Sequence, residues 1–311
     1  MERLNLLSGQ VKASSTAWHR VNIEKTIFPN VGDLKGKTLF ITGASRGIGL
    51  AIALRAAQDG ANIVVAAKTD KPHPKLEGTI HTAAQDIEKA GGKALAVVCD
   101  IRDEKSVQNA IDQAVSKFGG IDIVVNNASA ISPTGTLDTS MKTYDLMHSI
   151  NTRGTFLVTK LAIPHLKKSA NPHVLTISPP LDIFNTGKNW FSQTPAYTIA
   201  KYGMTLMAYG HAEELKEMGI AVNTLWPRTY IATAAVKNLL GGDESLKRAR
   251  KPEIMGDAAW HIITSDAKVI TGNYFMDDQV HISISPYQDL DAMYNCVEGT
   301  KTEDLLPDGF C

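Results

Sequence analysis

The sequence of 311 residues predicts an α/β fold, a doubly wound parallel sheet of about seven strands in a single domain. Its short β-rich runs are apolar almost without interruption, which is typical of strands buried on both faces. Amphipathic segments alternate with these runs from about residue 36 onward. The predicted strands are residues 38–42, 62–67, 94–100, 121–126, 173–178, 220–226 and 270–276. The predicted helices include residues 47–59, 80–90, 105–118 and 143–168. This alternation predicts right-handed crossovers with helices on both faces of the sheet.

Composition excludes several functions. Lys+Arg and Asp+Glu balance at 32 each, so no bulk field favours nucleic acid or an acidic membrane surface as the main partner. The three cysteines, Cys99, Cys296 and Cys311, form no CxxC pair, so we expect no disulfide framework, no metal site and a reducing compartment. No apolar stretch approaches the roughly 18 residues that span a bilayer.

The chain divides into three expected parts. Residues 1–35 form an N-terminal extension, residues 36–280 the α/β domain, and residues 281–311 a C-terminal tail. The extension carries Arg3, Lys12 and Arg20 against one acid, Glu2, which weakly resembles a mitochondrial presequence. A surface extension without targeting value is the favoured interpretation, so we expect a cytoplasmic protein, with a mitochondrial location as the alternative.

A glycine-rich turn follows the first predicted strand and opens the first predicted helix. Its glycines permit a tight turn and let the backbone approach a pyrophosphate, which the amides and dipole of the following helix stabilise. The spacing is GxxxGxG, and only its place within a strand–helix–strand unit makes dinucleotide binding a better interpretation than a plain turn. The predicted cofactor-binding residues here are Gly43, Ala44, Ser45, Arg46, Gly47, Ile48 and Gly49.

The end of the second predicted strand indicates which dinucleotide binds. An acid there would hold the ribose 2′-hydroxyl of NAD, whereas a base accommodates the 2′-phosphate of NADP. The strand ends at Lys68, and no acid follows before Asp70. Lys68 and Arg46 are therefore predicted to face the phosphate of NADP, which is favoured over NAD. The alternative is that Lys68 is only an exposed charge at a strand end.

Tyr197 and Lys201 are four residues apart in a predicted helix, which places them on one face, one turn apart. A neighbouring ammonium favours phenolate, so the pair predicts a Tyr197 pKa drawn down from about 10, as general acid/base catalysis requires. By itself this spacing is more often a solvated helix face. The upstream glycine-rich turn makes the catalytic interpretation the better one.

With these motifs in order, the chain resembles the short-chain dehydrogenase/reductase family, whose fold is the Rossmann type. The matching segments are residues 42–49, Asp100, residues 126–129 (Asn-Asn-Ala-Ser), Asn151, Tyr197 with Lys201, and residues 223–227. The resemblance implies that Tyr197, Lys201 and Asn151 are catalytic, with Asn151 supporting a proton-relay water. It also implies that Lys201 binds the nicotinamide ribose, that Asp100 contacts the adenine, and that Asn127 belongs to the cofactor site.

The resemblance narrows further to a group within the family whose members often add a sterol-carrier domain at the C-terminus. The segments 66–69, 72–76 and 126–132 carry this closer similarity. The chain continues for about 30 residues beyond its last predicted strand, so we expect no such domain in it. Dimers or tetramers that pair through two long helices are implied by the family alone.

Two positions depart from the family pattern. Pro179 stands where a second serine usually hydrogen-bonds the substrate carbonyl, and Arg228 stands where glycine is usual. Ser178 could replace the missing serine, or a hydroxyl of the inserted loop 179–194, Ser192 or Thr194, could do so. Which of them serves stays open at the level of sequence.

The implied function is NADP-dependent hydride transfer between nicotinamide and a carbonyl or alcohol carbon of an apolar or lipid-like substrate, with Tyr197 as general acid/base. Trp190, Phe191 and Met204 could line an apolar pocket, although such residues are more often core. The alternative function is an NADP(H)-binding protein of little or no turnover. A further alternative, nucleic-acid binding through the basic run 247–251, is disfavoured because such runs are usually solvated helix faces.

Overall fold

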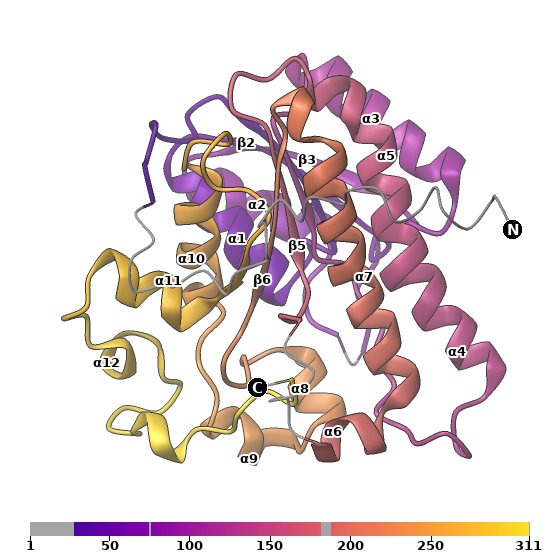
Figure 1. Ribbon diagram of the computed structural model, residues 1–311, viewed down its shortest axis with the longest axis vertical. Coiled ribbons are helices and arrows are strands. Elements are labelled where there is room, and N and C mark those ends of the chain that lie inside the picture. Colours follow the sequence, from indigo (N-terminus) through magenta and orange to yellow (C-terminus); the bar gives the residue numbers. More distant parts are fainter. Residues whose placement is uncertain (1–27, 75, 182–187, 311) are drawn as a thin grey trace, which may run out of the picture.

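Seven parallel strands form one sheet in the order β3-β2-β1-β4-β5-β6-β7. The structure is a computed structural model that describes residues 28–74, 76–181 and 188–310. Helices α3, α5 and α7 cover one face of the sheet, and α1, α10 and α11 lie on the other (Figure 1). The predicted doubly wound α/β domain is confirmed.

The boundaries of the elements follow the predicted ranges closely in the first half of the chain. The strands are β1 (Thr38–Thr42), β2 (Asn62–Ala67), β3 (Lys93–Val98), β4 (Ile123–Asn126), β5 (His173–Ile177), β6 (Ala221–Trp226) and β7 (Tyr274–Met276). The helices are α1 (Gly47–Gln58), α2 (Ile80–Lys89), α3 (Glu104–Phe118), α4 (Met141–His148), α5 (Thr155–Leu166), α6 (Lys188–Gln193), α7 (Pro195–Glu214), α8 (Ala234–Leu239), α9 (Gly242–Lys247), α10 (Glu253–Ile263), α11 (Asp277–Ile284) and α12 (Leu290–Tyr294).

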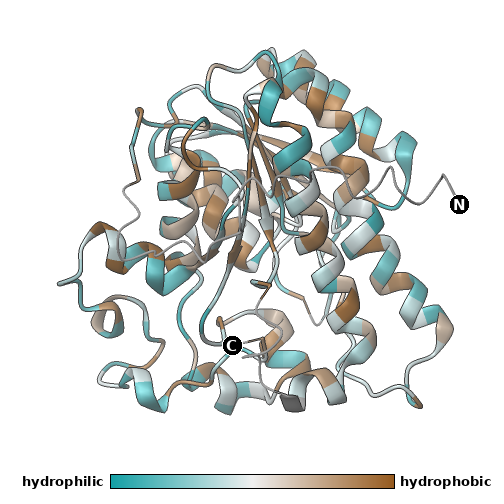
Figure 2. Cartoon of the chain, in the orientation of Figure 1, coloured by the Kyte–Doolittle hydropathy of each residue, from teal (hydrophilic) through white to brown (hydrophobic). Residues whose placement is uncertain are grey.

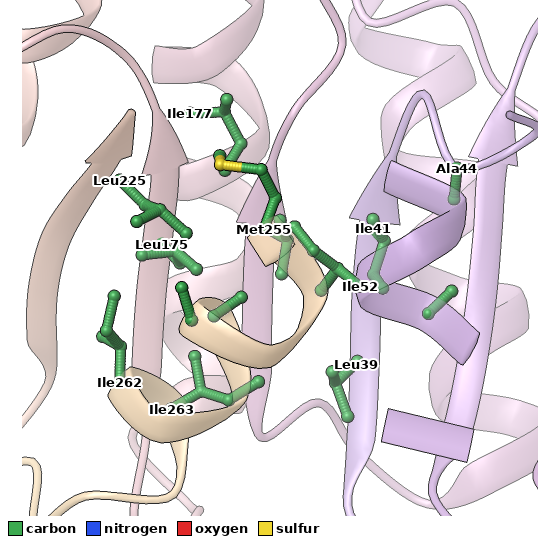
Figure 3. Close-up of a cluster of buried hydrophobic side chains, with 14 of the residues drawn as sticks. Leu39, Ile41, Ala44, Ile52, Leu175, Ile177, Leu225, Met255, Ile262 and Ile263 are labelled. Carbon is green, nitrogen blue, oxygen red and sulfur yellow. The ribbon is translucent and has the colours of Figure 1, made fainter. Parts of the chain in front are cut away.

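The strands are mainly apolar because both faces of the sheet are covered. Alternate side chains of β1 point to opposite faces. Leu39 and Ile41 pack in one cluster with Ile52 of α1 and Met255 of α10 (Figure 3), whereas Phe40 packs in a second cluster beneath α3 and α5. Hydrophobic colour accordingly concentrates along the strands and the inward sides of the helices (Figure 2).

The helix predicted over residues 143–168 is broken, so that prediction was partly wrong. Helix α4 ends at His148, a π-helical turn spans Ser149–Gly154, and α5 continues from Thr155. Within the turn, the Asn151 side chain accepts a bond from Ala130 N (2.8 Å) and donates one to Ala130 O (3.0 Å). This pairing with a distant loop explains a wider local turn that a helical sequence pattern cannot indicate.

The last strand is shorter than the predicted 270–276. Asn223 of β6 donates to Ile270 O (2.7 Å) and accepts from Asn273 N (3.1 Å), and Gly272 has a φ of 75°. Side-chain bonds, a glycine turn and two main-chain bonds to β6 therefore satisfy this backbone, and regular pairing begins only at Tyr274.

The topology reverses between β1 and β4, which are neighbours in the sheet. In such sheets the crevice at this reversal, beyond the carboxyl ends of the strands, is where ligands bind. Ile41 pairs with Val125, and Ile177 pairs with Leu225, so β1, β4, β5 and β6 end at one edge. The glycine-rich turn and the Asn-Asn-Ala-Ser segment therefore leave the sheet side by side.

Both ends of the described chain pack onto the domain. Phe28 lies 5.3 Å, ring centre to ring centre, from Phe275. Residues 1–27, on which the presequence hypothesis rests, lie outside the described residues. The segment predicted as a C-terminal tail contributes buried Tyr294, Leu305 and Phe310. This segment therefore packs as part of the domain.

Candidate active site

The glycine-rich turn is fastened to the end of β4. Thr42 Oγ1 accepts bonds from Asn127 N and Ala128 N, both at 3.0 Å, and Asn127 Nδ2 donates to Thr42 O (2.9 Å). Gly43 has a φ of 68°, which favours glycine. A Cβ on Gly49 would lie 2.5 Å from Asn127 Nδ2, so only glycine fits there. The predicted cofactor residue Asn127 therefore holds the turn against the sheet and also lines the cavity described below.

The amino terminus of α1 suits an anion. Its N-cap residue, Arg46, is extended and makes no side-chain cap, and the first turn holds no acidic residue. The first amides of α1 are therefore not capped by a side chain, and no carboxylate opposes a phosphate there. The Arg46 guanidinium instead donates to Glu77 O (2.7 Å) and Gly78 O (2.5 Å), which joins the turn to the loop after β2.

Basic side chains surround Asp100 at the end of β3. Arg102 donates to both Asp100 oxygens, at 2.9 and 2.6 Å, and Lys68 Nζ lies 3.5 Å from Oδ2. The hydrogen bonds from Arg102 hold the pKa of Asp100 well below its usual range, with Lys68 adding to the effect. The predicted adenine contact is thus already paired, whereas the Lys68 side chain stays 56% exposed.

Helix α7 places Tyr197 and Lys201 on its buried face, where they are 6% and 2% exposed. Pro195 starts the helix at a position where a missing N–H costs nothing. Lys201 Nζ donates to Ile177 O (2.7 Å) and lies 4.8 Å from the centre of the Trp226 ring. Burial lowers the pKa of Lys201 to about 7, although the Asp308 carboxylate opposes this shift.

The expected lowering of the Tyr197 pKa is wrong for this structure. Burial raises the pKa of Tyr197, and the negative charge of Asp308 raises it further. A hydrogen bond with Ser129 acts in the opposite direction. Spacing along the helix correctly put Tyr197 and Lys201 on one face, but it could not reveal a carboxylate from the far end of the chain.

Ser129 is the hydroxyl that sequence reasoning missed. It lines the same cavity as Tyr197 and stays exposed within it. Ser178 is fully buried, finds no hydrogen-bond partner among the described residues, and does not line this cavity. Thr194 donates to Trp190 O (3.0 Å), and Ser192 does not line the cavity either. The available signal was the serine in the last place of Asn-Asn-Ala-Ser, where the resembling family carries glycine.

Asn151 lies in the π-helical turn and is completely buried. Both polar atoms of its side chain pair with the Ala130 backbone. Its amide therefore positions the loop that carries Ser129.

The cavity at the carboxyl edge of the sheet measures about 190 Å³. Its lining is mainly apolar, with Tyr197, Lys201 and Ser129 among the polar groups. Of the three residues predicted to line such a pocket, Trp190 does so. Phe191 instead stacks on Tyr202 at 5.7 Å, and Met204 is buried beneath Lys201.

The basic run 247–251 is used within the fold. Arg250 is buried and donates to Asp291 (3.1 Å) and Thr302 (3.1 Å), while Arg248 donates to Asp304 O (2.7 Å). Lys247 lies 2.7 Å from Glu244. The contacts of Arg248 and Arg250 fasten the C-terminal segment to the domain, and Arg250 is buried away from any polyanion. Among the described helices, none has the length and apolar character to cross a bilayer.

Comparison with known proteins agrees with this architecture. Residues 37–242 match the short chain dehydrogenase family model. Hydroxysteroid dehydrogenase-like protein 2 of Danio rerio is 57% identical over 281 residues, which cover 90% of this chain and 65% of that protein. The chain thus spans between about half and two thirds of the length of the curated relatives it matches.

Two solved structures share the fold over nearly the whole chain. A short chain dehydrogenase from Mycobacterium thermoresistibile has a TM-score of 0.81 at 51% identity, covering 89% of this chain and 95% of that one. A Xanthomonas campestris protein, provisionally described as a dehydrogenase, has a TM-score of 0.83 at 48% identity, covering 90% and 99%. The chain belongs to the short-chain dehydrogenase family of oxidoreductases.

Proposed function

We propose that this protein is an NADP-dependent oxidoreductase that reduces a carbonyl group of a neutral, apolar or lipid-like substrate, with Tyr197 as general acid/base. One observation carries the proposal: Tyr197, Lys201 and Ser129 line one largely apolar cavity beside a turn suited to pyrophosphate. The residues present therefore fit a nicotinamide dinucleotide, the cofactor class of this family.

The binding roles follow from chemistry at each position. The amides of residues 43–49 would hold the pyrophosphate, and Asn127 and Lys201 would border the nicotinamide end. Arg46 and Lys68, close to the end of β2, support a 2′-phosphate and hence NADP. When bound, the cofactor supplies a hydride donor or acceptor at its nicotinamide ring.

Proton transfer is assigned to the protein. The phenol of Tyr197 is protonated at neutral pH and can donate to the oxygen of a carbonyl undergoing reduction, and its raised pKa makes it a weaker acid that needs help from a neighbouring charge. Ser129 would donate a hydrogen bond to the same oxygen, the role that Pro179 cannot fill. Lys201, when charged, would stabilise the phenolate that remains.

A screen of neutral aldehydes and ketones with NADPH tests this function. We expect Tyr197→Phe to lower kcat by roughly 10²–10⁴-fold, the usual contribution of a positioned acid, while the Kd for NADPH stays the same. Tyr287→Phe, at a site 95% exposed, is the matched control. Tight NADPH binding without turnover of any carbonyl would instead favour a binding protein of low activity.

We further propose that α5 and α7 form a self-association surface. Phe156 of α5 and Ile199 and Leu206 of α7 are large apolar side chains that remain 49–56% exposed. Contiguous exposed apolar residues are typical of protein interfaces. A homodimer or homotetramer would bury them.

A further inference from the structure

Two residues near the end of the described chain, Asp308 and Phe310, line the cavity that holds Tyr197. Residues 305–310 return along the segment that follows β6, where Tyr230 N donates to Leu306 O (2.8 Å) and Asp308 N donates to Arg228 O (3.0 Å). The last described residues accordingly lie next to α8, beyond the carboxyl ends of the strands (Figure 1). Backbone pairing thus places this segment against the cavity that holds Tyr197.

Phe310 is the apolar anchor of the segment. Its side chain is 2% exposed. Four aromatic rings surround it, with ring centres at 5.5 Å (Trp226), 5.6 Å (Tyr202), 5.9 Å (Trp190) and 6.0 Å (Tyr197). A buried aromatic ring among aromatic partners is strongly favoured in this setting. Phe310 therefore occupies space directly beside the proposed acid/base.

Gly309 makes the close approach possible. A Cβ at this position would overlap the indole of Trp190. The segment can therefore seat at this depth only with glycine here. The cavity that remains, about 190 Å³, is smaller than the roughly 300–1,000 Å³ of ordinary ligand pockets.

Asp308 brings a carboxylate to the same cavity. Its Oδ1 accepts from Trp226 Nε1 (2.7 Å) and from Phe310 N (3.0 Å). Burial raises its pKa to about 6, so the group is ionised at pH 8. The charge faces Lys201, Tyr197 and Tyr230, whose pKa values it shifts. An anionic substrate would meet this charge with little water to screen it.

We propose that residues 305–310, here called the C-terminal wall, select the substrate: Phe310 limits its bulk, and Asp308 excludes anionic carbonyl compounds. The proposal rests on the carbonyl reduction assigned to Tyr197. The preferred substrate is therefore a neutral carbonyl compound narrow enough to pass beside Phe310. The wall contains neither Tyr197 nor Lys201, but Asp308 and Phe310 line the same cavity as these two residues.

Bulk selection is tested with benzaldehyde and 9-anthraldehyde as probes. In Phe310→Ala, the affinity for 9-anthraldehyde relative to benzaldehyde should rise at least about tenfold, because even one methylene at a tight pocket changes selection by that order. Tyr287→Ala removes an aromatic ring at an exposed position and should leave the ratio unchanged.

Charge selection is tested with 4-formylbenzoate and its neutral isostere 4-formylbenzamide at pH 8. In Asp308→Asn, the relative affinity for the benzoate should rise about tenfold or more, since repulsion between two close charges is lost. Asp304→Asn, which changes an exposed acid immediately before the wall, should not alter the ratio.

Affinities are measured first as Kd by calorimetry with NADP⁺, which cannot reduce an aldehyde, and then as kcat/KM with NADPH. The proposed role of the C-terminal wall would be wrong if the affinity ratios of the probe pairs were the same in the parent and both variants. It would also be wrong if no probe bound. If the Kd ratios change in the variants but the parent turns over no probe, the wall selects what binds and the proposed carbonyl reduction is wrong.

How firmly the C-terminal wall packs against the domain is measured by hydrogen exchange without any ligand. Gly309→Ala should speed hydrogen exchange at the amides of Tyr230 and Asp308, which bond the wall to the domain. Gly120→Ala is the matched control, because its added methyl meets open space. Exchange in the parent as fast as in Gly309→Ala would show that the wall does not close the cavity.

Discussion

The ammonium of Lys201 lies 4.8 Å from the centre of the Trp226 ring, so a residue at the end of β6 holds the lysine of the proposed catalytic pair. The same indole donates to Asp308 through its Nε1. Trp226 thus stands between the catalytic pair and the C-terminal wall. An aromatic face stabilises a buried cation, which offsets part of the cost of desolvating Lys201.

Replacing this ring should move the titration of Lys201. Its pKa is already lowered to about 7, and Trp226→Leu should lower it further by removing a favourable contact of the charged form. If charged Lys201 assists Tyr197, the fall of kcat/KM at high pH should begin at lower pH in this variant. Trp226→Phe keeps an aromatic face and also loses the bond to Asp308, so it isolates the ring. Identical pH profiles for the two variants would contradict the assignment.

Ser129 should matter more than Ser178. Because Ser129 faces the cavity beside Tyr197, Ser129→Ala should lower kcat by about 10²-fold, the typical effect of removing one oxyanion donor. Ser178→Ala is the matched control, since its hydroxyl is buried outside the cavity lining. Steady-state reduction of the best neutral aldehyde gives both values. A larger loss of kcat in Ser178→Ala than in Ser129→Ala would instead assign the hydrogen bond to the substrate carbonyl to Ser178.

Lys68 should discriminate between the two cofactors. We expect Lys68→Ala to raise the KM for NADPH much more than the KM for NADH, because only NADPH carries the 2′-phosphate. The variant also removes the contact of Lys68 with Asp100, and this change should affect the KM values for NADPH and NADH equally. Lys71→Ala, an exposed lysine nearby, serves as the control. Equal rises for NADPH and NADH would remove the 2′-phosphate assignment.

Asp277 should make stability depend on pH. Burial, reinforced by Asp278, raises its pKa from 3.8 to about 7, and its Oδ2 has no partner among the described residues. Between about pH 4 and 7 the folded chain keeps a proton that the unfolded chain loses. The contribution of Asp277 to the free energy of unfolding therefore falls as pH rises through this window.

Asp277→Asn should remove that dependence. The variant can still accept the bond from Arg228 N. It should be more stable than the parent at pH 8, by at most roughly 4–5 kcal/mol, and no more stable at pH 4, because one pKa unit corresponds to about 1.4 kcal/mol. Urea unfolding at both pH values measures the difference, with exposed Asp33→Asn as the control. A parent-minus-variant difference that does not change with pH would contradict the role of this carboxyl.

Self-association should depend on α7. Leu206→Glu places a charge in the exposed apolar surface of α5 and α7, where burial against a second copy would then be costly. We expect sedimentation to show dissociation toward monomer, with an unchanged far-ultraviolet circular dichroism spectrum. Leu239→Glu alters a similarly exposed leucine on α8 and should not change the assembly. A parent that sediments as a monomer would contradict the proposed interface.

Local sequence alone determined the sheet, the glycine-rich turn and the common face of Tyr197 and Lys201. These features arise within one strand, turn or helix, where apolar periodicity and glycine placement act directly on the backbone. The break at Ser149–Gly154 escaped prediction because Asn151 bonds to a loop 21 residues away. The short length of β7 was not predicted for a similar reason, because the Asn223 side chain accepts a hydrogen bond from a backbone amide 50 residues farther along.

Tertiary structure alone decided the chemistry around Tyr197. Ser129 reaches it from the end of β4, and Asp308 and Phe310 reach it from the other end of the chain. The bond from Trp226 to Asp308 spans 82 residues. No periodicity encodes such a contact, because it depends on where the sheet edge and the returning segment meet. Burial and charge at that meeting point then set the pKa of Tyr197, which the spacing to Lys201 could not.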